Sequence, residues 1–224
     1  MSDATRPPRR TLIAATMALA TPVLRAAAEG DPRRIDFEGM RAGAPPTGFT
    51  FALTGGGPAP HWVVVEDASS AAGPKVLAEN SGDRTDYRFP LAILDGFSAR
   101  DVALSVRFRA VEGRVDRAAG LVVRYRDAGN YYVARANALE DNVRLYRVVD
   151  GRRTQFAGVS ASVPRDRWQT LGLRIQGDRI EVALDGRRLF GATDRSFTEA
   201  GGIGLWTKAD SVTLFDALEV QPLG

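Results

Sequence analysis

The sequence predicts an all-β protein, built as a sandwich of two antiparallel sheets, and three observations support this prediction. Residues 120–149, GLVVRYRDAGNYYVARANALEDNVRLYRVV, form three runs in which apolar and polar residues alternate, as in strands with one face on a core. Short runs of this kind recur at near-regular spacing, with glycine, proline and aspartate between them. No helical period of useful length follows residue 28.

The elements follow in order from these runs. The candidate strands share an alternating or β-branched pattern and cover residues 35–38, 49–53, 61–66, 75–79, 87–93, 102–110, 119–126, 131–136, 143–149, 154–160, 169–176, 179–184, 187–192, 202–207 and 211–221. Hairpin turns are predicted where short polar pairs separate neighbouring runs, at Asp150-Gly151, Gly177-Asp178 and Asp185-Gly186. The segments 42–46 and 54–60, rich in glycine and proline, predict irregular connections.

Residues 1–28 have the features of an export signal. An arginine-rich start, with Arg9 and Arg10 adjacent, precedes the mildly apolar segment 11–24, and three alanines then offer a cleavage site. The arginine pair resembles a twin-arginine signal, and the alternative is an ordinary secretory signal. The segment 11–24 is too short to span a bilayer as a helix. We also expect no membrane span in the mature chain, which would start near Glu29. We therefore expect a periplasmic or secreted protein with one domain over residues 34–222.

The predicted signal carries the whole net charge. The chain has a formal net charge of +3, and residues 1–28 contain four arginines and one aspartate. The remaining residues therefore hold equal numbers of cations and anions, which gives no support for a nucleic-acid partner. The chain has no cysteine, which excludes disulfides, thiolate metal sites and a cysteine nucleophile.

Four segments carry a family resemblance: IDFEG at 35–39, the central segment 120–146, WQTLGLRIQGDRIEVALDGRRLF at 168–190 and GGIGLWTKADSVTLFDALEV at 201–220. Together they resemble the concanavalin A-like jelly-roll superfamily, and within it the laminin-G-like and 3-keto-disaccharide-hydrolase type domains called glycoside hydrolase-like. The resemblance implies two curved sheets, with small ligands on the concave sheet or its rim loops. Because this superfamily includes hydrolases, lectins and adhesion modules, the fold leaves the function open.

No group of residues matches a catalytic signature. Laminarinase-type members of this superfamily carry the carboxylates of E-x-D-x-x-E on one strand, whereas residues 179–184 offer only Glu181, with Asp185 already in a turn. His61 is the only histidine and is predicted to be an ordinary polar residue at a strand edge, because a general base needs a positioned partner.

A row of polar residues on the central strands is the first candidate binding surface. Arginine and asparagine offer fixed donors to sugar hydroxyls or carboxylates, and the alternative is a solvated face with paired charges. If the strands pair in sequence, the residues of this row share one face: Arg124, Arg135, Asn137, Asn142, Arg144 and Tyr146.

The turn at 137–142 and one tryptophan add further candidates. Glu140 and Asp141 in that turn are suited to sugar hydroxyls or a cation, and the alternative is a turn held by its own polar side chains. Trp206 lies among glycines, which predicts a flat, open platform for a sugar, and the alternative is a tryptophan that covers the rim of the core.

Asp216 is the candidate for a metal site. Its parity in the last strand predicts a carboxylate that faces the core, which requires a partner. A β-bulge with an arginine or backbone partner is the favoured explanation. The alternative is a structural Ca²⁺ held with Asp36 or Glu38, and we expect no other cofactor.

These features together predict an exported carbohydrate-associated binding module without catalysis, whose ligand is an oligosaccharide or glycoside. The first alternative is an enzyme of the 3-keto-glycoside hydrolase type, with Arg135, Glu140 and Asp141 as its catalytic candidates. The second alternative is a structural adhesion module.

Overall fold

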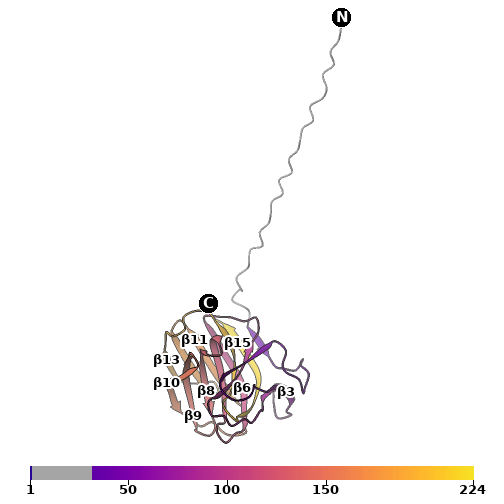
Figure 1. Ribbon diagram of the computed structural model, residues 1–224, viewed down its shortest axis with the longest axis vertical. Helices are drawn as coiled ribbons and strands as arrows, with labels where there is room; N and C mark the ends of the chain where they lie inside the picture. The colour runs from indigo at the N-terminus through magenta and orange to yellow at the C-terminus, as the bar shows by residue number, and fades with distance from the viewer. Residues whose placement is uncertain (2–31) are drawn as a thin grey trace.

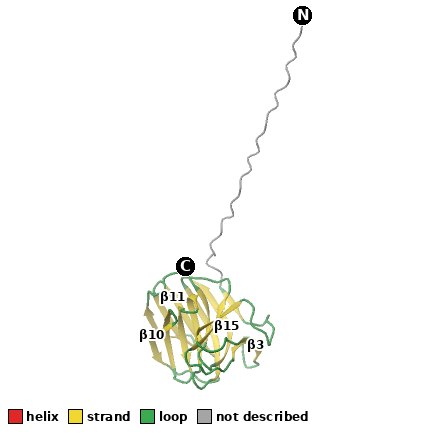
Figure 2. Ribbon diagram, in the orientation of Figure 1, coloured by secondary structure: helices red, strands yellow, loops and turns green. Residues whose placement is uncertain are grey.

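The computed structural model describes Met1 and residues 32–224, so the predicted signal in residues 1–28 lies outside the described part of the chain. Strands and loops, with no helix, make up the described residues (Figure 2). The strands are β1 (Arg33–Ile35), β2 (Phe49–Gly55), β3 (Trp62–Glu66), β4 (Lys75–Glu79), β5 (Arg88–Leu94), β6 (Val102–Glu112), β7 (Ala118–Asp127), β8 (Asn130–Asn137), β9 (Asn142–Val149), β10 (Arg152–Ser160), β11 (Gln169–Gln176), β12 (Arg179–Leu184), β13 (Arg187–Thr193), β14 (Gly202–Trp206) and β15 (Val212–Pro222). Within residues 32–224 there is no helix long and apolar enough to cross a membrane.

The strands form two sheets that pack into a sandwich. Sheet A has the order β13-β12-β11-β6-β15-β4-β3, with β1 also paired to β15, and sheet B has the order β10-β9-β8-β7-β14-β5-β2. All paired strands are antiparallel. Strands β10 and β13 lie at one edge of the sandwich and β3 at the other (Figure 1). The predicted all-β, two-sheet fold is therefore confirmed.

The core lies between the sheets because alternate residues of each strand point inward. In β6, Val102, Leu104, Val106 and Phe108 are buried, whereas the residues between them are partly exposed. Each large apolar side chain buried in this way stabilises the fold by about 1.5–3 kcal/mol. The β6 pattern is the one that the sequence alternation predicts for a half-buried strand.

Sheet B also buries apolar side chains on the face that points away from sheet A, here called its outer face. A second apolar cluster on this face contains side chains of sheet B alone, among them Phe89 of β5, Tyr131 and Val133 of β8, and Trp206 of β14. The central strands are thus apolar on one face and partly apolar on the other. Buried polar residues, among them Arg135 and Asn142, lie on the same outer face as this apolar cluster.

Two hairpin turns show the backbone that the sequence predicts. Asp150 and Gly151 have φ values of 48° and 76°, and Asp185 and Gly186 have 48° and 74°. Positive φ at both central residues is the requirement of a type I′ turn, which aspartate tolerates and glycine favours. These turns set the registers of β9 with β10 and of β12 with β13.

The first strand and the last strand differ from prediction. Strand β1 covers 33–35, and the chain turns at 37–39, where Phe37 has a φ of 63°. In β15 the register with β6 shifts between Asp216 and Glu219, with Ala217 at a φ of 47°. The bulge reverses the parity of the strand, so Leu214 is partly exposed while Leu218 is in the core.

Candidate functional site

Most of the predicted binding residues meet on the outer face of sheet B. Strands β8 and β9 pair Arg135 with Arg144 and Asn137 with Asn142, and side chains of directly opposed residues share a face. Tyr146 lies on the same face, opposite Val133. These five residues of the predicted polar row therefore lie on one face.

Arg135 is the centre of a buried polar network. The residue is only 3% exposed, and its Nη2 donates to Glu140 Oε2 and to Asn142 Oδ1, both at 2.7 Å. Its guanidinium carbon lies 5.4 Å from the ring centroid of Tyr146. Asn142 Nδ2 in turn donates to Glu140 Oε2 at 2.9 Å. The three polar side chains thus hold one another in fixed orientations.

Asp116 and Lys208 extend this network toward the loops. Asp116 Oδ1 accepts a hydrogen bond from Asn137 Nδ2 at 2.7 Å, and its Oδ2 lies 3.0 Å from Lys208 Nζ and 4.0 Å from Arg135 Nη1. Lys208 Nζ also lies 2.5 Å from Asp86 Oδ1. We call Arg135, Asn137, Glu140, Asn142, Asp116, Lys208 and Asp86 together the outer-face cluster.

The loop that carries Asp116 is held by Asp210. The Asp210 carboxylate accepts backbone hydrogen bonds from Arg114, Val115 and Asp116 at 2.8–3.0 Å. Burial alone would raise the pKa of Asp210, but these backbone donors lower it below its ordinary value. A carboxylate on the loop after β14 therefore fixes the loop before β7, which places Asp116 beside Lys208.

Glu140 is the accessible acid of the cluster. Its side chain is 52% exposed, although its carboxylate is bound to Arg135 and Asn142. Burial alone would raise its pKa, but the hydrogen bond from Asn142 and the charge of Arg135 more than offset that effect, so the pKa is lowered. Glu140 is therefore an ionised hydrogen-bond acceptor at neutral pH and a poor proton donor.

Asn137 and Asp141 hold the turn, as the alternative interpretation of this segment proposed. Asn137 Oδ1 accepts backbone hydrogen bonds from Leu139 at 2.8 Å and from Glu140 at 3.1 Å. Asp141 has a φ of 47°, and its Oδ1 accepts the Val163 backbone N–H at 3.0 Å. Of the two acids in the turn, Glu140 points to Arg135 while Asp141 ties the turn to the segment after β10.

Trp206 is not the open platform that the sequence predicts. The ring is 0% exposed, and the centroid of Phe89 lies 5.3 Å from it. The guanidinium of Arg153, on β10, lies 5.7 Å from the same ring. Gly120 on β7 leaves room for the indole, since a Cβ there would lie 3.0 Å from its Cε3 atom. The neighbouring glycines serve packing, and Trp206 is part of the outer-face apolar cluster.

Arg124 lies apart from the other predicted residues, so its predicted place in the polar row is wrong. The register of β7 with β8 shifts after Val123, and Arg124 has a φ of 50°. Its buried side chain donates to the backbone carbonyls of Arg100, Gly177 and Phe197. Burial, the largest effect, lowers the pKa of this guanidinium. These contacts join β7 to the β11–β12 turn and make Arg124 a structural residue.

Asp216 is buried as predicted, but it does not face the inter-sheet core. The residue is 0% exposed, and its carboxylate accepts hydrogen bonds from Ser70 Oγ, from the Ala217 backbone at 2.6 Å and from Arg107 Nη1 at 3.5 Å. The segment with Ser70 covers it on the outer side of sheet A, and the bulge accounts for the change of parity. Asp216 thus has the arginine and backbone partners, beside a bulge, that the favoured explanation names.

The other two metal candidates have partners of their own. Asp36 Oδ1 accepts the Glu38 backbone N–H at 3.2 Å, and Glu38 Oε1 accepts the Lys75 backbone N–H at 2.8 Å. Over residues 32–224, no group of three or more histidine or acidic side chains is arranged to hold a metal ion. His61 is an exposed residue at the edge of a strand, as predicted, and its Nδ1 lies 2.6 Å from Asn80 Oδ1.

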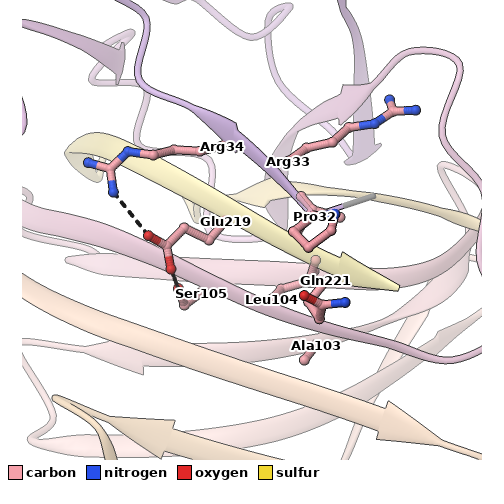
Figure 3. Close-up of a pocket in the computed structure, with 9 residues that line it drawn as sticks. Pro32, Arg33, Arg34, Ala103, Leu104, Ser105, Glu219 and Gln221 are labelled. Atoms are coloured by element: carbon pink, nitrogen blue, oxygen red, sulfur yellow. Dashed lines mark hydrogen bonds and ion pairs between the residues drawn. The ribbon is translucent and has the colours of Figure 1, made fainter. Parts of the chain in front are cut away.

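Sheet A has a pocket on its outer face. It has a volume of about 390 Å³ and is lined in part by Arg33, Arg34, Ser105 and Glu219 (Figure 3). Arg34 Nη1 and Glu219 Oε1 lie 3.0 Å apart, with side chains 50% and 54% exposed. An exposed pair of this kind contributes little to stability. The more buried cluster on sheet B is the stronger candidate site.

Four residues of this face were not predicted from the sequence: Asp86, Asp116, Arg153 and Lys208. Asp86, Asp116 and Lys208 come from loops and Arg153 from the edge strand β10, so no alternation within strands β8 and β9 includes them. One compositional signal was present: the chain has only two lysines, at positions 75 and 208, and both are held by several oxygen atoms.

Comparison with known proteins places the fold. No family model and no curated protein match the chain. Among solved structures, it is similar to the carbohydrate-binding module CBM66 from Bacillus subtilis, with 19% identity and a TM-score of 0.60 over 76% of this chain and 94% of that one. The cellulose-induced protein Cip1 has 11% identity and a TM-score of 0.64 over 85% and 97%.

A third structure was solved with a sugar. Domain 4 of AbnA, an extracellular GH43 arabinanase from Geobacillus stearothermophilus in complex with arabinotriose, has 15% identity and a TM-score of 0.52 over 77% of this chain and 82% of that one. At these identities the similarity establishes the fold alone. The chain therefore has a jelly-roll fold of two antiparallel sheets.

Proposed function

We propose that this protein is a carbohydrate-binding module whose ligand lies on the outer face of sheet B. The observation that carries the proposal is the contact of one arginine nitrogen, Arg135 Nη2, with both Glu140 and Asn142 beside the face of Tyr146. The exposed carboxylate of Glu140 offers an acceptor and the partly exposed Arg144 offers donors, while the buried Arg135 and Asn142 hold that carboxylate in position. A sugar presents the complementary hydroxyls.

The geometry suits recognition because its polar atoms are held in advance. Arg135, Asn142 and Glu140 bind one another, so little side-chain entropy is lost when a ligand adds its hydroxyls. Two of the structural neighbours support a sugar as the ligand: one is named a carbohydrate-binding module, and one was solved with arabinotriose. Residues 1–28 carry the features of an export signal, so we place this module in the periplasm or outside the cell.

The proposal includes the absence of catalysis. General-acid catalysis of glycoside cleavage needs a carboxyl group that stays protonated, whereas the pKa of Glu140 is lowered. The 3-keto-glycoside hydrolase alternative draws support from one observation, since the exposed Glu140 carboxylate next to Arg135 is suited to act as a base. Release of reducing sugar from a 3-keto-glycoside, abolished in Glu140→Gln, would establish this alternative in place of a non-catalytic module.

Calorimetric titration with a broad panel of oligosaccharides tests the binding proposal. The informative variants are Glu140→Ala and Arg144→Ala, because both side chains are partly exposed on the proposed face and their loss leaves the core intact. The matched control is Arg174→Ala, an exposed arginine on sheet A. We expect saturable binding that weakens in the two test variants and is unchanged in the control. Absence of binding across the panel, or an equal loss in the control, would reject this site.

A further inference from the structure

Arg153 is a cation enclosed by aromatic rings on the outer face of sheet B. Its guanidinium carbon lies 4.5 Å from the ring centroid of Phe89, 4.6 Å from that of Tyr146 and 5.7 Å from that of Trp206. The backbone N–H of Arg153 donates to the Tyr87 hydroxyl at 2.7 Å, which fixes the strand beneath it. Cation–π contacts of this kind orient the guanidinium at the edge of the outer-face cluster.

No acidic side chain contacts this guanidinium. Within residues 32–224 it forms no ion pair and donates no hydrogen bond, and its Nη1 atom is buried without a partner. The charges of Asp86 and Asp116 interact with the charge of Arg153, but both carboxylates are bound to Lys208. Buried polar groups without partners are rare in proteins, and a partly buried guanidinium normally pairs with a carboxylate or phosphate. Burial also lowers the pKa of Arg153, which is the effect of a cation removed from water.

The charges of this face leave one cation in excess. Glu140 lies 2.7 Å from Arg135, and Asp86 and Asp116 lie 2.5 Å and 3.0 Å from Lys208. Arg144, which shares the face, forms no ion pair among the described residues either. The face therefore holds four cations (Arg135, Arg144, Arg153 and Lys208) against three acids (Asp86, Asp116 and Glu140).

We propose that the ligand of this face is an acidic glycan that contains a uronic acid, with its carboxylate paired to Arg153. This inference rests on the proposed function, since the hydroxyls of the same sugar would meet Glu140 and Arg144. A guanidinium forms strong charge-assisted hydrogen bonds with a carboxylate. The exposed ring of Tyr87 lies 4.6 Å from that of Phe89 and offers an apolar surface beside the charge.

Calorimetric titration of the protein with oligogalacturonate, oligomannuronate and oligoglucuronate tests this inference. Each is compared with its carboxyl-reduced counterpart, which keeps the sugar and removes the charge. We expect at least one uronate to bind roughly tenfold or more tightly than its reduced form, the ratio for a charge-assisted hydrogen bond. Arg153→Met should bring the uronate to the affinity of the reduced sugar. The matched control is Arg152→Met, which removes an exposed arginine of the same strand and should keep the ratio.

The outcomes separate the inference from the proposal beneath it. Equal binding of the acid and its reduced form overturns the uronate inference and leaves the carbohydrate-binding proposal standing. Binding of neither also overturns the uronate inference, and the broad oligosaccharide panel then decides the carbohydrate-binding proposal. Arg153→Lys is measured alongside, because it keeps a cation over the rings if Arg153→Met does not fold. We expect several-fold weaker uronate binding in Arg153→Lys with the reduced sugar unaffected. An unchanged ratio in either folded variant overturns the role of Arg153.

Discussion

Arg135 Nη2 meets Glu140 Oε2 at 2.7 Å, although the arginine is 3% exposed and the glutamate side chain is 52% exposed. The pair therefore joins a buried cation to a carboxylate at the surface. Because Asn142 binds both partners, the carboxylate oxygens are held in a defined orientation toward solvent. This relationship makes a hairpin turn of sheet B the proposed contact for a sugar.

The first prediction concerns Glu140 and pH. Its folded pKa is lowered from an ordinary value of 4.5. The ionised carboxylate therefore contributes to sugar affinity above that value, and this contribution is lost as pH falls through the folded pKa. Affinity for a neutral oligosaccharide should therefore be constant from pH 8 to pH 5 and fall only in more acidic solution. Glu140→Gln should bind roughly five- to tenfold more weakly and show no such step. A loss of affinity between pH 8 and pH 5 in the unmodified protein would argue against Glu140 as the acceptor.

The second prediction concerns the stability contributed by a buried ion pair. Arg88 and Glu79 are both 0% exposed with 3.3 Å between Nη2 and Oε1, and Arg88 also donates to the backbone carbonyls of Pro58, Ala59 and Ala209. Arg88→Met leaves Glu79 as an uncompensated buried charge and should lower the free energy of unfolding by about 3–5 kcal/mol in denaturant titrations. Arg34→Met, which breaks an exposed pair, should cost no more than about 1 kcal/mol. Similar losses in the two variants would contradict the structural role of Arg88.

The third prediction concerns Asp216. Burial, its largest effect, raises the pKa of this carboxyl above 3.8 despite the hydrogen bonds from Ser70 and Ala217. A raised folded pKa gives a contribution to stability that is complete below the unfolded value and is lost as pH rises through the folded pKa. Asp216→Asn should unfold more easily by about 1–3 kcal/mol, because one acceptor is lost. The difference between the two proteins should be largest in acid and shrink as pH rises.

The melting temperature with and without a chelator separates this account from a metal site. With Arg107, Ser70 and the Ala217 backbone as partners, we expect a chelator to leave the melting temperature unchanged in both proteins. A decrease that occurs only in the unmodified protein would instead support the Ca²⁺ alternative with Asp36 or Glu38.

The fourth prediction concerns the tryptophans. Trp62 and Trp206 are 2% and 0% exposed, whereas Trp168 is partly exposed, with its Nε1 donating to Ser69 Oγ at 3.0 Å. Iodide should therefore quench the fluorescence of Trp168 alone, and Trp168→Phe should leave an emission that resists the quencher. Persistent quenching in that variant would show that Trp62 or Trp206 is accessible, and its loss in Trp206→Phe would restore Trp206 as a candidate platform.

The sequence was sufficient for the sheet and for much of the site. Alternation placed β4 at 75–79 and β11 at 169–176, the residues that the structure assigns to them. The same alternation put Arg135, Asn142 and Tyr146 on one face, because directly opposed residues in consecutive antiparallel strands share a face. Local pattern and tertiary structure agree wherever strands pair in sequence.

The rest depends on features that a local pattern does not contain. The backbone torsion at Arg124 and the bulge after Asp216 change where side chains point, and neither position has a glycine to mark it. Arg153 of β10 covers Trp206 of β14, although β9, β8 and β7 lie between these two strands in sheet B. Contacts between distant strands decide these positions.

The most direct test of the proposed site is an amide NMR titration with the tightest oligosaccharide from the panel. The account predicts chemical-shift changes that saturate with ligand and centre on the turn at 137–142, on Tyr146 and on Arg153. Changes centred on Ala103, Gly172 and Ala183, which line another pocket on sheet A, would place the ligand on the opposite face and contradict the account.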